Sequence, residues 1–156
     1  LVNIDKVRST GFELEAQANI ADGLDLFANY GYTHSRVKKY AVDPTLVGNV
    51  TPYVPKDTWA LGAQYKKDLS SSLALFTRAD VEHHGKQYWD PENSTARSGY
   101  ELVNARLGFE HPDGNWSLIA SVENLFDKKY NSEWVLGGFA HPGLPRTWSV
   151  DLTVKF

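Results

Sequence analysis

Cysteine is absent from all 156 residues, which excludes a disulfide framework, a thiol nucleophile and a thiolate metal site. Methionine is absent too, even at position 1, so we expect the sequence to begin inside a longer precursor. Neither sign of charge dominates, since sixteen basic and nineteen acidic residues leave a net charge of −3. Because the chain is close to neutral, we expect no nucleic-acid partner.

Long apolar runs are also missing. No stretch approaches the ~20 residues of a transmembrane helix, no basic-then-apolar signal segment opens the sequence, and no helical period of 3.6 is visible. A hydropathy scan therefore indicates a soluble protein. A membrane-spanning strand, however, shows lipid only every second residue and averages out as mildly polar. A membrane β-barrel is thus compatible with this composition.

The sequence shows a regular alternation of apolar and polar residues, most clearly in its last nine residues. Apolar Trp148, Val150, Leu152, Val154 and Phe156 take every second position, with polar residues between them. A period of two puts the apolar side chains on one face of a strand. The run also has about the length of a tilted membrane-spanning strand, roughly 9–11 residues.

Six earlier segments alternate in the same way, with Phe27, Phe76 and Ile119 as exceptions on the polar side. The strands that we expect cover 7–20, 24–33, 58–65, 73–82, 103–110, 116–123 and 148–156. Tight turns join neighbours, as at Ala21-Asp22-Gly23. The predicted fold is all-β, an antiparallel up-and-down meander of about seven strands.

The connections between these segments alternate in length. Short turns at 21–23, 67–71 and 111–114 alternate with long loops at 37–55, 88–98 and 128–146. A transmembrane barrel has short turns at one end and long loops at the other. A Greek-key sandwich has no reason to sort its connections in this way.

Aromatic residues collect at both ends of the predicted apolar face. Near the short turns lie Tyr65, Phe109, Trp116 and Phe156, and near the long loops lie Tyr30, Tyr32, Trp59 and Trp148. The positions between them are mostly Leu, Ala and Val. Two aromatic belts around an aliphatic band are typical of a protein that crosses two membrane–water interfaces.

Three linked elements stand in order at the end of the chain. Ser121 to Tyr130 contains V-x-N-L-F-D-x-x-Y, Pro145 to Trp148 reads P-R-x-W, and the sequence ends on an aromatic residue. Near the start, Thr10 to Glu15 reads x-G-x-E-x-E. With these motifs the chain resembles the C-terminal end of a TonB-dependent outer-membrane receptor.

The resemblance implies a bacterial outer-membrane protein with a barrel of about twenty-two strands and a plug inside it. Such receptors import scarce nutrients, most often ferric siderophores, with energy delivered by the TonB protein. Residues 1–156 would be the C-terminal part of the barrel, about its last third, without the plug, the earlier strands or the N-terminal segment that TonB grips. Transport would then belong to the whole receptor, and membrane lipid and the rest of the receptor would be partners.

The same resemblance gives the final strand a role in assembly. An alternating strand with a terminal aromatic resembles the signal read by the barrel-assembly machinery. That signal would consist of Trp148, Val150, Leu152, Val154 and Phe156.

The predicted long loops carry most of the candidate ligand-binding residues, because long loops on a rigid scaffold are where binding residues concentrate. Aromatic rings with a few cations suit bulky, often anionic iron chelates through stacking and charge. The candidates are Tyr40, Tyr53, Tyr88, Trp89, Arg97, Trp134, Phe139 and Arg146. The alternative is that these side chains pack loop on loop.

We predict no catalytic residues, no metal site and no cofactor, and hence no enzyme. The adjacent His83 and His84 would point to opposite faces of a strand, so they cannot chelate one ion together. Charged residues on the polar face are read as a solvated wall with cross-strand pairs.

Two other protein classes remain open on the sequence. The chain could be a smaller structural outer-membrane barrel, which an eighth strand would allow because bacterial barrels are even-numbered. It could also be a soluble β-sandwich binding module whose apolar face is its core.

Overall fold

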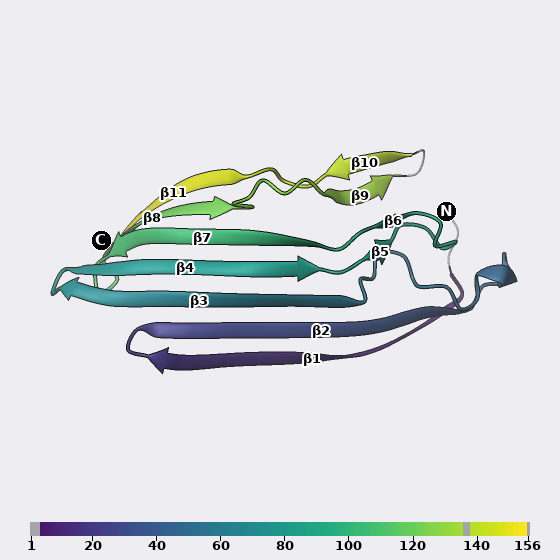
Figure 1. The fold of residues 1–156 in the computed structure, drawn as a ribbon, viewed down its shortest axis with the longest axis horizontal. Helices are drawn as coiled ribbons and strands as arrows, with labels where there is room; N and C mark the ends of the chain where they lie inside the picture. Colours follow the sequence, from purple (N-terminus) through teal and green to yellow (C-terminus); the bar gives the residue numbers. More distant parts are fainter. Residues whose placement is uncertain (1–3, 136–137, 156) are drawn as a thin grey trace.

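The computed structural model describes residues 4–135 and 138–155, and within them the chain forms one long antiparallel sheet (Figure 1). Phe156, part of the predicted assembly signal, lies outside the described residues. The main strands are β1 (Lys6–Ala21), β2 (Leu24–Lys39), β3 (Asp57–Ser70), β4 (Leu73–His84), β7 (Tyr100–Glu110), β8 (Trp116–Glu123) and β11 (Thr147–Val154). Their order in the sheet is the order of the chain. The predicted meander of seven strands is confirmed.

The three long loops lie at one end of the sheet and the short turns at the other, as Figure 1 shows. The loops contain small elements: the 3₁₀ turn η1 (Pro44–Leu46), and the two-stranded pairs β5 (Gln87–Tyr88) with β6 (Ala96–Arg97) and β9 (Asn131–Val135) with β10 (Phe139–Pro142). We call the two ends the loop end and the turn end. None of the described residues belongs to a helix with the length and hydropathy of a membrane span.

Several boundaries differ from the sequence prediction. β3 continues to Ser70, through most of the turn expected at 67–71, and β7 begins at Tyr100 rather than at residue 103. The first long loop was expected from residue 37, but β2 continues to Lys39 because Val37 is fully buried against Tyr40 and Leu46 of that loop. The second and third loops were expected to contain no strands, yet each folds back on itself as a short hairpin. Alternation could not reveal these hairpins, because their strands of two to five residues are too short to show a period of two.

The register places the two kinds of side chain on separate faces of the sheet. Leu61 pairs with Val81, which pairs with Val103 on the apolar face. Three rows toward the turn end, Arg78 pairs with Arg106, which pairs with Ser121 on the polar face. In the described chain the apolar face is open, with Leu107 57% and Val150 69% exposed. Leucine and valine residues that belonged to a sandwich core would be buried, so the sandwich interpretation is wrong.

The three exceptions to the alternation each lie beside a glycine on a neighbouring strand. The ring of Phe27 occupies the space in which a Cβ on Gly62 would sit, and the Arg78 guanidinium lies 4.6 Å from the centre of that ring. Phe76 and Ile119 flank Gly108 from either side in one register row. Glycine therefore makes room for large apolar side chains on the polar face.

Gly11 of the x-G-x-E-x-E segment has a different role. A Cβ at this position would collide with the backbone carbonyl oxygen of Tyr32 on β2. The close approach of β1 and β2 requires a residue without a side chain there.

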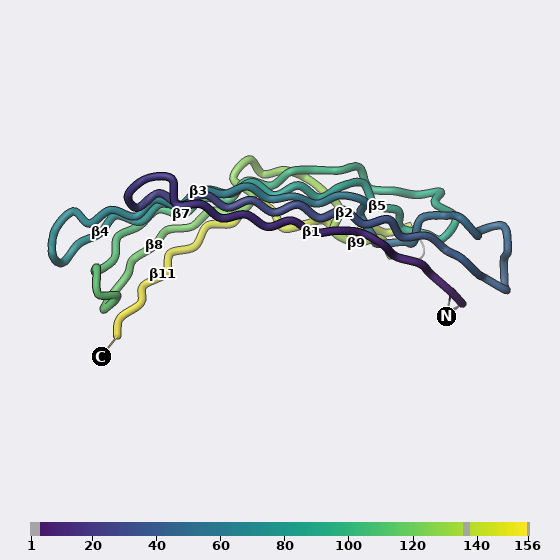
Figure 2. Tube along the Cα trace, turned by 90° about the horizontal axis from the view of Figure 1, so that it is seen from below, coloured from purple at the N-terminus to yellow at the C-terminus, as the bar shows by residue number. Residues whose placement is uncertain are grey.

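Both outer strands of the sheet have one unpaired edge in this chain. β1 pairs only with β2, and β11 pairs only with β8. Each unpaired N–H or C=O group costs several kcal/mol in a membrane, roughly the price of a lost hydrogen bond in hydrocarbon. The sheet is also arched along its length (Figure 2), and its apolar face is uncovered.

We expect adjacent residues on β7 to report opposite environments in the intact receptor. A cysteine at Leu107 should be shielded by lipid from a water-soluble thiol reagent, while one at Arg106 should react once any plug is removed. The measurement is the rate of labelling of L107C and R106C in membranes. Equal rates, or faster labelling at 107, would contradict the assignment of faces, because a one-residue slip inverts every side chain.

We expect residues 1–156, produced alone, not to form a water-soluble monomer. Two open edges and a large exposed apolar face should drive edge-to-edge and face-to-face association. Light scattering with and without detergent measures the particle mass. A monodisperse monomer in detergent-free buffer would refute this expectation.

Candidate functional site

The first two long loops are fastened to each other by side-chain amides. The amide oxygen of Asn93 accepts from the N–H of Val50 at 2.8 Å, and its nitrogen donates to the Val50 carbonyl at 2.9 Å. Asn49 donates to the carbonyl of Pro91 at 2.9 Å. The N–H of Tyr53 donates to the Tyr88 carbonyl at 2.9 Å. We call this contact the loop clip.

Asn93 and Tyr53 hold unusual backbone conformations within the clip. Their φ angles are +57° and +61°, in the left-handed region that most side chains avoid. Asparagine tolerates this region well, whereas a large aromatic residue is strained there. Strain of this kind persists only where the surroundings over-determine the conformation, and the four hydrogen bonds of the clip do so.

Asp90 shapes the second loop from inside. Its carboxylate accepts from the N–H groups of Ser94 at 2.8 Å and Thr95 at 2.7 Å, and from the Thr95 hydroxyl. Burial by itself would raise the pKa of Asp90, but the hydrogen bonds from Thr95 and Ser94 lower this pKa below its ordinary value. The ionised carboxylate thus holds the turn that joins β5 to β6.

Aromatic rings and one arginine connect all three loops. The Tyr53 and Trp89 rings meet edge to face at 5.4 Å, and the Tyr53 hydroxyl donates to the carbonyl of Trp134 in the third loop at 2.7 Å. The Arg97 guanidinium lies 5.8 Å from the centre of the Trp89 ring and 4.5 Å from that of Tyr100. These distances are within the range of cation–π attraction.

A stack of rings continues this series onto the sheet. Tyr100 lies between His84, at 4.9 Å, and Tyr130, at 4.3 Å, with nearly parallel planes. Gly143 allows the third loop to pass this stack, because a Cβ there would collide with the Tyr130 ring. We call Tyr53, Trp89, Arg97, Tyr100 and Tyr130 the loop-end cluster.

The predicted ligand-binding residues divide into those brought together here and those placed elsewhere. Tyr53, Tyr88, Trp89, Arg97 and Trp134 gather at or beside the loop-end cluster. Tyr40 instead packs in the small core under the first loop, Phe139 begins β10, and Arg146 lies at the base of the third loop. Their roles in ligand binding stay predictions.

Exposure separates the candidates further. Trp89 and Tyr40 are 6% and 9% exposed, so they support neighbouring residues and offer a ligand little surface. Tyr53 and Phe139 are 47% and 72% exposed. Among these four, Tyr53 and Phe139 are therefore the side chains that a ligand can contact.

The structure also shows a set of residues whose role the sequence prediction missed. Asn124 is buried, with φ at +51°, and its side chain joins both ends of the third loop. Its nitrogen donates to the carbonyls of Lys128 and Leu144, each at 3.0 Å, and its oxygen accepts from the Lys128 N–H at 2.7 Å. The Asn124 N–H donates to Asn104 on β7 at 3.0 Å.

Asp127 completes this base of the third loop. Its carboxylate accepts from Lys129 at 2.9 Å and from the N–H of Arg146 at 3.1 Å, and these hydrogen bonds lower the pKa of Asp127 below its ordinary value. The Arg146 guanidinium donates to the carbonyl of Leu125 at 3.3 Å. The N-L-F-D and P-R-x-W motifs therefore face each other and close the loop, and Arg146 serves this closure.

The two adjacent histidines have different surroundings. His83 stacks on Trp59 at 5.3 Å and lies between Asp57, at 3.2 Å from Nε2, and Glu101, at 2.8 Å from Nδ1. His84 stacks on Tyr100, as described above. The prediction that these imidazoles lie on opposite faces agrees with their separate partners. Among the described residues, no group of three metal-ligating side chains comes together.

We expect Asn124→Ala to loosen the third loop specifically. The substitution removes three part-buried hydrogen bonds to Lys128 and Leu144, each of which contributes about 0.5–1.5 kcal/mol. Hydrogen exchange of residues 124–146 in the intact receptor should then accelerate at least tenfold. Asn19→Ala is the control, because the Asn19 side chain donates an exposed hydrogen bond to Asp25 at the turn end, far from the third loop. Unchanged exchange in the N124A variant would show that Asn124 does not hold the loop.

Comparisons with known proteins agree with this architecture. The chain is 33% identical to the ferric-pyoverdine M114 receptor PbuA of Pseudomonas sp. (strain M114), over 99% of this chain and 19% of that protein. It is 32% identical to the ferrioxamine receptor of Yersinia enterocolitica, over 97% of this chain and 21% of that protein. The chain therefore spans about a fifth of the length of these curated relatives.

A solved structure matches the fold as well. The crystal structure of the ferric yersiniabactin uptake receptor FyuA from Yersinia pestis gives a TM-score of 0.82 at 25% identity, covering 96% of this chain and 24% of that one. The family model described as TonB dependent receptor-like, beta-barrel, matches residues 1–125. The sequence, the topology and all three comparisons agree, and the chain belongs to the TonB-dependent receptor β-barrel family.

Proposed function

We propose that this chain is the C-terminal barrel segment of a receptor that imports ferric siderophores across the bacterial outer membrane, where barrels of this family lie. Residues 1–156 would form part of the barrel wall and three extracellular loops. The plug, the earlier strands and the segment contacted by TonB would belong to the remainder of the receptor. The segment itself would have no catalytic role.

The observation that carries this proposal is the loop-end cluster. Three loops far apart in the sequence are joined by aromatic and cationic side chains at the loop end of the barrel wall. The cluster holds the loops in place around the exposed ring of Tyr53, and this ring, with the exposed ring of Phe139, suits a bulky iron chelate with aromatic groups through stacking. The names of the two curated relatives, a ferric-pyoverdine receptor and a ferrioxamine receptor, support the same substrate class.

The chain spans only about a fifth of the length of its curated relatives. This favours a segment of a large receptor over a complete small barrel. A closed eight-stranded barrel would need one more strand to pair the open edges of β1 and β11. In a larger barrel, preceding strands pair with both edges. Barrel insertion would then depend on the assembly machinery, which is expected to read the alternating final strand.

We expect the intact receptor to support TonB-dependent uptake of at least one ferric siderophore. Cells that lack other receptors would be given radioactive iron as ferric pyoverdine, ferrioxamine or ferrichrome, with and without a working TonB protein. Uptake that requires both the receptor and TonB supports the proposal. If none of a broad panel of ferric siderophores is bound or transported, the proposal is wrong.

Two equally exposed phenylalanines provide a matched control for the loops. Phe139 is 72% exposed in the β10 hairpin, and Phe126 is 74% exposed at the base of the same loop. Phe139→Ala should weaken siderophore binding about two- to tenfold, since an aromatic contact contributes roughly 0.5–1.5 kcal/mol beyond its buried area. Phe126→Ala should leave affinity unchanged. Equal effects of the two variants would remove Phe139 from the binding surface.

A further inference from the structure

Tyr53 occupies a turn position at which glycine is normally preferred. Pro52 and Tyr53 are the central residues of a turn in the first long loop. Proline fixes φ at about −65° in the first of these positions, and the φ of +61° at Tyr53 is typical of the second position of a type II turn. Glycine or asparagine suits this second position, because a bulky side chain is crowded at positive φ. The ring of Tyr53 is therefore held against the preference of its own backbone.

Contacts from the second and third long loops hold Tyr53 in this conformation. Its N–H donates to the Tyr88 carbonyl at 2.9 Å. Its ring meets that of Trp89 edge to face at 5.4 Å, and its hydroxyl donates to the Trp134 carbonyl at 2.7 Å. The conformation of Tyr53 is thus set by the neighbouring loops and not by its own turn.

Asn93 fixes the segment that carries Tyr53. The amide oxygen of Asn93 accepts from the N–H of Val50 at 2.8 Å, and its nitrogen donates to the carbonyls of Val50 at 2.9 Å and Asp90 at 3.2 Å. Val50 stands three residues before Tyr53. Because both ends of the amide are engaged inside the loop clip, Asn93 can act on a ligand only through the residues that it holds.

The half-exposed ring of Tyr53 is linked to the polar face of the sheet. The Arg97 guanidinium connects the ring of Trp89, beside Tyr53, to that of Tyr100. Tyr100 stands on β7 six residues before Arg106 and shares its face, because a strand repeats every two residues. The polar face lines the interior of the barrel. The Tyr53 ring is therefore part of the entrance through which a chelate would pass.

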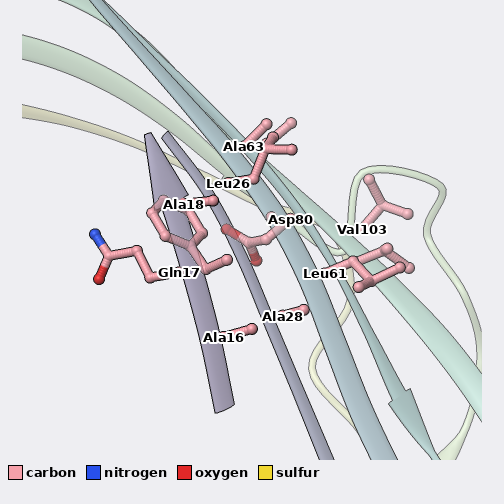
Figure 3. A pocket seen from close by; sticks show the side chains of 13 residues that line it. Ala16, Gln17, Ala18, Leu26, Ala28, Leu61, Ala63, Asp80 and Val103 are labelled. Atoms are coloured by element: carbon pink, nitrogen blue, oxygen red, sulfur yellow. The ribbon is translucent and has the colours of Figure 1, made fainter. Parts of the chain in front are cut away.

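A hollow in the barrel wall lies on the opposite face. Its lining combines the small side chains of Ala16, Ala18 and Ala28 with the larger Leu26 and Leu61 (Figure 3). All five belong to the apolar face of β1 to β3, which meets lipid. A chelate that enters at the loop end would meet the Tyr53 ring and not this hollow.

We propose that the loop clip holds backbone strain at Tyr53 so that the ring is presented to the ferric siderophore, and that Asn93 is the positioning residue for this ring. Glycine would suit the turn better but would supply no ring for a chelate. A ring that is held in place before binding loses little freedom on contact with the ligand, which favours affinity. The role of Asn93 rests on the proposed function and extends it to a residue whose own side chain is engaged elsewhere.

Hydrogen exchange of the intact receptor, measured without a siderophore, tests whether position 53 is strained. Tyr53→Ala and Tyr53→Gly both remove the ring, its contact with Trp89 and the hydrogen bond to Trp134. They differ in the Cβ, which makes a left-handed backbone unfavourable. Residues 49–53 should therefore exchange about fivefold faster in Y53A than in Y53G. Equal rates would show that the position carries no strain and would overturn the proposal.

Affinity for ferric siderophores tests whether Asn93 acts through the ring. Ferric pyoverdine, ferrioxamine and ferrichrome are titrated separately into the intact receptor, and the affinity is measured by calorimetry. For each siderophore that the wild type binds, Tyr53→Gly should weaken affinity about two- to tenfold, because one aromatic contact is lost. Asn93→Ala should weaken it by no more than the same factor. Tyr53→Phe keeps the ring and should bind more tightly than Y53G.

The double variant N93A/Y53G separates positioning from a merely structural role. If Asn93 acts only through the Tyr53 ring, the double variant binds as Y53G does, whereas a structural role would add a further loss of affinity. In N93A/F139A the two losses should multiply, because Phe139 lies in the third loop, outside the clip. Asn19→Ala, the same substitution at the turn end, should change neither the exchange of residues 49–53 nor the affinity.

Wild-type affinity in N93A, or a further loss in N93A/Y53G relative to Y53G, would overturn the proposal. If the wild-type receptor binds no ferric siderophore, the proposed function is wrong, and the ligand role of Tyr53 is wrong with it. A failure of the proposed function is thus seen in the wild type, and a failure of the positioning role is seen only in the variants.

Discussion

Backbone hydrogen bonding between neighbouring strands is the constraint on which the rest of this structure depends. Inside a membrane every N–H and C=O group needs a partner, and only the adjacent strand can supply it. The seven strands therefore follow one another in chain order, and each fixes the register of the next. Once register is fixed, so is the face of every side chain, from the lipid-facing leucines to the arginines of the polar wall.

Glycine residues determine where large apolar side chains can stand on the polar face. Phe27 stands on the polar face because Gly62 leaves room beside it and Arg78 lies over its ring. The polar wall of the barrel is thus not uniformly hydrophilic. It holds apolar side chains at defined positions: Arg78 covers the ring of Phe27, and Phe76 and Ile119 lie on either side of Gly108.

The sequence allowed the strands, the turn end and the loop end to be predicted, because a period of two extends over eight or more residues in each strand. It could not show that Tyr40 would be buried while Tyr53 stayed open, since both are loop tyrosines with no periodic context. Nor could it reveal that Asn124 holds the third loop. The N-L-F-D motif was visible in the sequence. The side chain of its Asn124, however, donates to the backbone carbonyls of Lys128 and Leu144, and no pattern of residue types marks such hydrogen bonds. The role of Phe156 in barrel assembly remains a prediction that rests on its place at the end of the sequence.

The loop clip makes the first two extracellular loops a single unit for sequence change. The side-chain amide of Asn93 both accepts from the Val50 N–H and donates to the Val50 carbonyl. A change in loop length that shifts either residue would therefore break both hydrogen bonds. Insertions are accommodated only outside the clipped positions, for example around the exposed Val42. The tips of these loops can therefore vary, while the spacing of the clipped positions is fixed by their hydrogen bonds.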